Sequence, residues 1–213
     1  MSTVNGLACE PRRVFCIGRN YAAHIAEMGV VDDGECVVFL KPATSLVPWG
    51  APVRLPRGVG AVHHELEVVV ALTAGGREIS RSRARELVGA ATLGLDLTLR
   101  DVQAGLKARG RPWELAKAFD GSAPLGQWRS AQNLDLEAVD LSCHVNGVLR
   151  QEGSTAQLLF PVVRLIEILS RTWELLPGDL IFTGTPAGVG PVKPGDELVG
   201  ASPQLGRWAW RFE

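Results

Sequence analysis

The sequence predicts a β-rich α+β fold, and three observations support this. Short runs of β-branched and large apolar residues outnumber the segments with helical periodicity. Turn-forming residues separate these runs, including Pro-Gly-Asp at residues 177–179 and again at 194–196. Neither an internal repeat nor a long linker divides the 213 residues. We therefore expect one domain over residues 1–213, in which residues 1–12 form a short N-terminal extension.

The expected elements follow from the local pattern. Apolar, β-branched runs predict strands, which in chain order are residues 13–17, 37–41, 65–71, 91–97, 140–145, 179–183 and 197–200. Helical periodicity is best at residues 82–89 and 161–172. The second of these segments places its apolar residues on one helix face: Val162, Val163, Leu165, Ile166 and Leu169.

Composition excludes several classes of protein. With 46% hydrophobic residues and a formal net charge of -1, the chain is neither disordered nor a typical nucleic-acid binder. Its four cysteines have no Cys-x-x-Cys spacing, which disfavours a zinc site. The sequence shows no signal peptide and no apolar run long enough to span a bilayer. We expect no membrane partner, and a cytoplasmic location with reduced thiols.

Two carboxylates stand two residues apart in an apolar run. Glu65 and Glu67 lead into Val68, Val69 and Val70, and residues i and i+2 of a strand share a face. The pair could lie on a solvated sheet face. If it is buried, the two charges repel each other, and burial costs several kcal/mol unless a cation lies between them. A hard divalent cation would meet that need.

A third carboxylate, Asp96, interrupts the apolar run 91–97. It could be paired with a cation, cap a following helix, or bind a metal. Three carboxylates, with water and a substrate oxygen, would suit Mg²⁺ or Mn²⁺, which prefer six oxygen ligands. Zinc is disfavoured, because this set has no nitrogen or sulfur ligand. If a helix follows Asp96, then Arg100 and Gln103 lie at i+4 and i+7, on the side of the metal, where they could bind a carboxylate.

Two further segments carry candidate site residues. In a short helix, Glu27 would lie at i+3 from His24, orient its imidazole and raise its basicity, although His24 could equally be a surface or core histidine. The glycine-rich turn 183–190 lacks the Gly-Lys-Ser/Thr of a phosphate loop, which disfavours nucleotide binding. It is either a plain connection between strands or a loop that brings backbone amides and the Thr185 hydroxyl to a substrate carboxylate. Gly18, at a predicted strand end, would let the backbone approach a ligand.

Seven segments together resemble the fumarylacetoacetate hydrolase family. They are residues 16–24 (CIGRNYAAH), 39–42 (FLKP), 63–67 (HHELE), 94–98 (GLDLT), 116–120 (AKAFD), 145–147 (VNG) and 183–190 (TGTPAGVG). Their order and spacing are those of the family, and the resemblance extends from about Val14 onward. The short chain is most similar to the compact acylpyruvase-like members. The resemblance implies a mixed β-sandwich or roll with short peripheral helices, and a homodimer.

The resemblance also implies roles for individual residues. Glu65, Glu67 and Asp96 would bind Mg²⁺ or Mn²⁺, and His24 with Glu27 would activate a water. Lys117 would bind the substrate and stabilise an enolate as charge develops. The remaining expected substrate-binding residues are Gly18, Arg19, Arg100, Gln103 and Thr185.

The implied reaction is hydrolysis of a 2,4-diketo acid, such as fumarylpyruvate, to pyruvate and a carboxylic acid. Oxaloacetate decarboxylation and isomerisation of 2-hydroxyhepta-2,4-diene-1,7-dioate are alternatives for the same site. A non-catalytic protein that binds metal or a dicarboxylate is the alternative from another class. In either case the expected partner is a small 2-keto acid or dicarboxylate. Residues 25–36 are expected to be mobile without ligand and ordered by it, because their glycines permit hinge motion.

Overall fold

The computed structural model describes residues 10–29 and 34–213. Most of the expected N-terminal extension, residues 1–9, lies outside this range, as do residues 30–33 of the segment 25–36 that is expected to be ordered by ligand. The strands are β1 (Val14–Gly18), β2 (Val37–Lys41), β3 (Leu46–Val47), β4 (Val62–His64), β5 (Leu66–Leu72), β6 (Val88–Leu95), β7 (Thr98–Leu99), β8 (Ala123–Pro124), β9 (Arg129–Ser130), β10 (Asp140–Val145), β11 (Val148–Ser154), β12 (Leu180–Phe182), β13 (Gly190–Val192), β14 (Glu197–Ser202) and β15 (Gly206–Arg211). The helices are α1 (Ala22–Glu27), α2 (Arg81–Ala84), α3 (Arg100–Ala108), α4 (Glu114–Lys117) and α5 (Val162–Thr172), with 3₁₀ turns η1 (Ala43–Ser45), η2 (Arg85–Leu87) and η3 (Thr155–Gln157).

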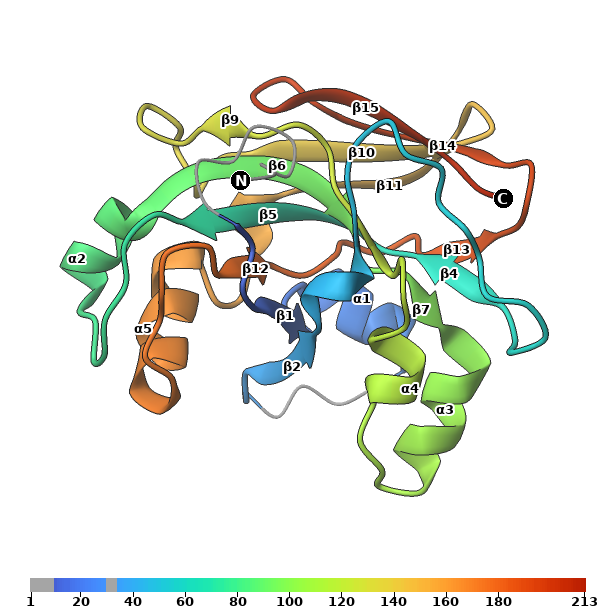
Figure 1. The fold of residues 1–213 in the computed structure, drawn as a ribbon, viewed down its shortest axis with the longest axis horizontal. Coiled ribbons are helices and arrows are strands. Elements are labelled where there is room, and N and C mark those ends of the chain that lie inside the picture. Colours follow the sequence, from blue (N-terminus) through green and yellow to red (C-terminus); the bar gives the residue numbers. More distant parts are fainter. Residues whose placement is uncertain (1–9, 30–33) are drawn as a thin grey trace.

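Two sheets form the body of the molecule. The larger has the strand order β2-β1-β12-β5-β6-β9, in which β1 and β12 are parallel and the other neighbours antiparallel. The smaller, β11-β10-β14-β15, is antiparallel and lies over β5 and β6 (Figure 1). The pairs β13-β4-β7 and β3-β8 complete the β structure of the described residues. This confirms the predicted β-rich α+β fold.

The helices are short and lie at the periphery. In Figure 1, α2 and α5 pack together at one end of the molecule, and α3 and α4 project side by side from the other end. Among the described residues, no helix is both long and apolar enough to cross a membrane.

Strand β5 is buried on both faces, which explains its nearly continuous apolar sequence. Alternate residues such as Val68 and Val70 belong to the larger core, which extends to the small sheet. The residues between them, Val69 and Ala71, belong to a second, smaller core. Glu67 lies on the same face of β5 as Val69 and Ala71, so its carboxylate is at the end of a buried apolar face.

Two predicted elements differ from the structure in detail, and one of the alternatives for Asp96 is excluded. The predicted strand 65–71 begins one residue later, at Leu66, whose amide donates to the Gln151 side chain (3.0 Å). The predicted helix 82–89 ends early, since Val88 pairs with β5 as the first residue of β6. Asp96 caps no helix: β7 follows it, and Leu99 is the residue before α3.

Candidate metal and substrate site

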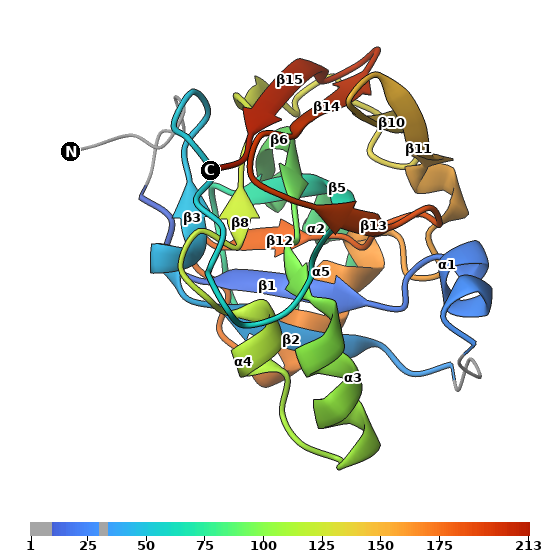
Figure 2. The same cartoon turned by 90° about the vertical axis from the view of Figure 1, so that its right-hand side faces the viewer.

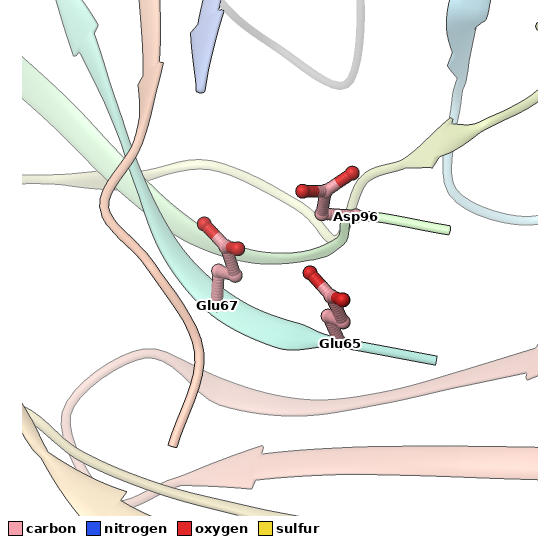
Figure 3. Close-up of side chains that lie close together, drawn as sticks. All are labelled: Glu65, Glu67 and Asp96. Carbon is pink, nitrogen blue, oxygen red and sulfur yellow. The ribbon is translucent and has the colours of Figure 1, made fainter. Parts of the chain in front are cut away.

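Strand pairing gathers the three predicted carboxylates. Because β5 pairs with β6 so that Glu67 faces Gly94, the chain leaving β6 brings Asp96 beside Glu65, and the Asp96 amide donates to the Glu65 carbonyl (2.9 Å). Figure 3 shows the three carboxylates turned toward one another. One oxygen from each lies within 4.8 Å of the others, and all three residues are buried.

Cations surround two of these acids. Lys117 Nζ lies 2.8 Å from Glu65 Oε2 and 2.7 Å from Asp96 Oδ2. Arg100 also pairs with Glu65, and Lys41 Nζ lies 2.9 Å from Asp96 Oδ1. Glu67 differs, because it accepts a hydrogen bond from the Gly184 amide (2.7 Å), and none of the ion pairs within the described ranges includes it.

The pKa values of Glu65 and Glu67 differ in the same way, since one is lowered by nearby cations and the other is raised. Burial alone would raise the pKa of Glu65, but the Lys117 and Arg100 cations outweigh it and hold that pKa well below the usual range. Burial raises the pKa of Glu67 well above its ordinary value, and the negative charges of Asp96 and Glu65 add to this effect. Burial would lower the pKa of Lys117, yet Asp96 and Glu65 raise it, so its ammonium stays charged.

These residues fit a hard divalent cation. Asp96 Oδ1 is buried, and the nearby Lys41 ammonium is not aligned to donate to it, so this oxygen has no hydrogen-bond partner among the described residues. Glu67 is a buried carboxylate beside two others, and no cation pairs with it in the part of the chain that the structure describes. Carboxylate oxygens are the ligands that Mg²⁺ and Mn²⁺ prefer.

Lys41 is a site residue that sequence reasoning missed, although it lies in one of the matched segments. It is 2% exposed, and its ammonium donates to the Ser122 hydroxyl (2.9 Å) and to the carbonyl of Lys117. It therefore ties the segment carrying Lys117 to Asp96. A lysine ending an apolar strand usually extends to solvent, so the sequence offered no local signal for this role.

Helix α1 forms the predicted histidine–glutamate pair. His24 is buried, and its Nδ1 lies 3.0 Å from Glu27 Oε2. Because a carboxylate only accepts, Nδ1 carries the proton and Nε2 is left as a base. The other Glu27 oxygen accepts from the Gly188 amide (3.0 Å), which connects α1 to the glycine-rich turn.

A small cavity of about 40 Å³ joins the dyad to the acids. His24, Glu65 and Lys117 line it, and Arg100 donates to Gln103 Oε1 (2.8 Å) in its wall. The remaining lining residues are Gly18, Arg19, Ile25, Met28, Phe39, Lys107 and Trp113. A larger hollow of about 960 Å³ lies between β10, β11 and β14 and holds none of the predicted site residues.

Of three further predicted residues, Gly18 and Arg19 line the cavity and Thr185 does not. Gly18 ends β1 at the cavity, where an added Cβ would lie 3.5 Å from the Trp113 ring. Arg19, also in the lining, has a left-handed backbone (φ 59°). Thr185 is not brought into the lining, because its hydroxyl donates to the Leu66 carbonyl (2.8 Å) and accepts from Gln151 (2.7 Å). Its hydroxyl therefore holds the turn against β5.

Phe39, Lys107 and Trp113 were not predicted to line the site. Lys107 had a usable signal, since it lies at i+7 from Arg100 and so on the same helix face. The two aromatic residues had none, because an apolar residue that lines a cavity has the same local pattern as one in the core.

Comparison with known proteins is consistent with this geometry. The model of the fumarylacetoacetate (FAA) hydrolase C-terminal family matches residues 13–212. The chain is 44% identical over 188 residues to the oxaloacetate tautomerase YcgM of Escherichia coli (strain K12), covering 87% of this chain and 86% of the relative. It is 40% identical over 189 residues to the mitochondrial oxaloacetate decarboxylase of Dictyostelium discoideum, covering 88% and 87%.

A solved structure matches nearly the whole chain. The fumarylpyruvate hydrolase of Pseudomonas aeruginosa, in complex with Mn²⁺ and pyruvate, superposes with a TM-score of 0.93 at 41% identity, covering 99% of this chain and 94% of the other. The family match spans the acid cluster, the dyad and the cavity. The chain belongs to the fumarylacetoacetate hydrolase family, whose members include hydrolases, tautomerases and decarboxylases.

Proposed function

We propose that this chain is a divalent-metal enzyme that hydrolyses the C3–C4 bond of 2,4-diketo acids such as fumarylpyruvate. The observation that carries the proposal is the convergence of two groups of residues on one cavity. The acid cluster reaches it through Glu65, and the water-activating pair reaches it through His24. A protein that only binds metal or a dicarboxylate has no need of an oriented base at that position.

Glu65, Glu67 and Asp96 would hold Mg²⁺ or Mn²⁺, in keeping with the Mn²⁺ bound to the Pseudomonas aeruginosa hydrolase. When bound, the cation acts as a Lewis acid toward the 1-carboxylate and 2-oxo oxygens of the substrate. Lys117 adds a permanent positive charge where negative charge develops on the pyruvate part. Its raised pKa makes it a poor proton donor, so we assign it electrostatic stabilisation.

His24 supplies the base. Its Nε2 takes a proton from a water, and the hydroxide adds to the C4 carbonyl. The C3–C4 bond then breaks, its electron pair passes to the pyruvate enolate, and C3 takes up a proton from water to give pyruvate, while His24 releases its proton to solvent. Glu27 keeps the imidazole in the productive tautomer and stabilises its protonated form. Arg100 and Gln103, hydrogen-bonded to each other, present a cation and an amide to the substrate carboxylate.

Oxaloacetate chemistry is the second candidate, and the oxaloacetate tautomerase and decarboxylase relatives favour it. Tautomerisation moves a proton between C3 and the enol oxygen, and decarboxylation releases CO₂ from the same carbon framework. Both reactions pass through an enolate, which the same cation and Lys117 would stabilise. They do not require an attacking water.

A substrate panel separates the candidates. We expect acetylpyruvate and fumarylpyruvate to be consumed, with loss of ultraviolet absorbance and formation of pyruvate, in the presence of Mg²⁺ or Mn²⁺. Oxaloacetate is tested in parallel, by the decay of its enol absorbance and by release of CO₂. Turnover of oxaloacetate with no cleavage of either acylpyruvate would overturn the hydrolase proposal in favour of the second candidate.

A further inference from the structure

Helix α3 extends the cavity outward along one face. Arg100, Gln103 and Lys107 stand at positions i, i+3 and i+7, and all three line the cavity. Arg100 contacts Glu65 at the metal end, and α3 leads from there away from the two sheets (Figure 2). At about 1.5 Å per residue, Lys107 stands roughly 10 Å farther along the helix axis than Arg100.

Trp113 holds the Lys107 side chain at the outer end of the cavity. The ammonium lies 5.0 Å from the centre of the Trp113 ring. The indole is itself fixed, with its ring 5.9 Å from that of Phe39 and its edge against Gly18. Lys107 is therefore a positioned cation rather than a freely moving surface lysine.

Lys107 differs from the other lysine of the cavity in its charge balance. Lys117 is paired with two carboxylates, whereas no carboxylate of the described residues lies within 4.0 Å of the Lys107 ammonium. Its neighbours in the cavity include the Arg100 and Lys117 cations. Burial, and then these two cations, lower the pKa of Lys107 to about 8. A half-buried cation beside others of the same sign is stabilised when an anionic ligand is bound.

We propose that Lys107 binds the distal carboxylate of the substrate and so selects acylpyruvates that end in a second carboxylate. This inference rests on the proposed function, which places the 2-oxo acid end at Glu65, Glu67 and Asp96. The second carboxylate of four-carbon oxaloacetate would then lie near Arg100. That of seven-carbon fumarylpyruvate lies three carbons farther out, toward Lys107.

The test compares two non-hydrolysable ligands of equal length. Calorimetry on the Mn²⁺-loaded protein would measure binding of 2-oxoadipate, which ends in a carboxylate, and of 2-oxohexanoate, which ends in a methyl group. We expect the wild type to prefer 2-oxoadipate by about ten- to hundredfold, the range of one hydrogen bond to a charged group. K107M should abolish the preference and K107R should retain it.

Oxalate, which lacks a distal group, shows whether the inner site is intact, and its affinity should be the same in wild type, K107M and K107R. K193M, at an exposed lysine outside the cavity, is the matched control and should behave as wild type. A K107M protein that keeps its preference for 2-oxoadipate, or weakens both six-carbon ligands equally, would overturn the proposal.

Turnover then separates this inference from the function on which it rests. In K107M, the KM for fumarylpyruvate should rise about tenfold or more, with little change for acetylpyruvate. If the wild type hydrolyses neither substrate yet prefers 2-oxoadipate through Lys107, the hydrolase proposal fails and the distal-carboxylate role stands.

Discussion

The two ends of the cavity are built in different ways. At the inner end, Glu67 and Lys41 belong to strands of the large sheet, and Asp96 follows another of its strands. At the outer end, the lining comes from α3, which projects away from the sheets (Figure 1), and from Trp113 just before α4. The inner end holds acids and cations in mutual contact, whereas the outer end holds Lys107 with no carboxylate partner in the described structure.

The inner end therefore carries the residues proposed for the reaction, and the outer end carries those proposed for substrate selectivity. Strand pairing sets the spacing of the acids, so the inner geometry is fixed before any ligand binds. A buried charge is also costly to leave unpaired, which makes each member of this network sensitive to substitution. Short helices at the periphery have fewer neighbours and can change without disturbing the sheet.

The largest effect is expected at the inner end, for Glu67→Gln. This change removes one of three proposed ligands while keeping the side-chain volume. Loss of groups that merely support a ligand costs about 10- to 100-fold in metal affinity, so loss of a ligand should cost at least about 100-fold, with activity falling in parallel. Calorimetric titration with Mn²⁺ and Mg²⁺ measures the affinity. Glu86→Gln, at an exposed glutamate, is the matched control, and unchanged metal binding in Glu67→Gln would refute the ligand assignment.

The next effect concerns His24, which lies between the two ends. His24→Ala should reduce acylpyruvate hydrolysis by about 10²-fold or more, because the attacking water loses its base. Oxaloacetate decarboxylation should retain more of its rate, since it requires no attacking water. Glu27→Gln should have a smaller effect of the same kind, because the imidazole loses its carboxylate partner but remains present.

Both reactions of His24→Ala are measured on the same metal-loaded preparation, by pyruvate formation and by CO₂ release. Equal losses in both would contradict the division of roles and show that His24 also protonates the enolate.

The sequence predicted the inner end better than the outer end, for a physical reason. Glu65, Glu67 and Asp96 stand out because charged residues in apolar runs demand a counter-charge, and the family resemblance supplied their common role. The sequence could not show that Lys41 approaches Asp96, since that contact depends on how strands distant in sequence are arranged. The β-rich fold class followed from local patterns, but the order of strands in the sheets did not.

The outer end had a weaker sequence signal. In the sequence, Trp113 and Phe39 have the pattern of ordinary apolar residues, and only the folded chain shows that they line the cavity. For Thr185 the sequence signal was misleading. Its position in a glycine-rich turn indicated a ligand contact, yet its hydroxyl is hydrogen-bonded to Gln151 and to the Leu66 carbonyl. A polar side chain near a site can serve the fold, and sequence alone does not distinguish the two uses.

A pH dependence should distinguish the outer end from the inner end. The pKa of Lys107 is lowered to about 8, so the side chain is charged below that pH and neutral above it. The charged groups facing it are Arg100 on its own helix, Lys117 from α4, Glu65 before β5 and Arg19 after β1. The ratio of kcat/KM for fumarylpyruvate to that for acetylpyruvate should therefore fall several-fold between about pH 7 and 9.

Taking the ratio cancels groups that act on both substrates, including the His24 base and the bound metal. Steady-state kinetics with both substrates in the same buffers provides the measurement. Lys107→Arg should make the ratio constant with pH, because a guanidinium remains charged throughout this range. A ratio that is already constant in the wild type would show that Lys107 does not titrate against the distal carboxylate.

A change in local protection, with no change in chemistry, is expected for α1, which closes the cavity between the two ends. Its described contacts to the rest of the site include the Glu27–Gly188 hydrogen bond (3.0 Å) and the approach of Met28 to Arg100 (3.9 Å). A cavity of about 40 Å³ has room for only a few water molecules, so we expect α1 to move when an acylpyruvate enters.

Without ligand, the α1 amides should exchange with solvent hydrogen much faster than those of β5, which is buried on both faces. Oxalate with Mg²⁺ should slow the α1 exchange by about tenfold and leave β5 unchanged, as measured by hydrogen exchange and mass spectrometry. Full protection of α1 in the free protein would mean that the site is preformed and that substrate enters by another route.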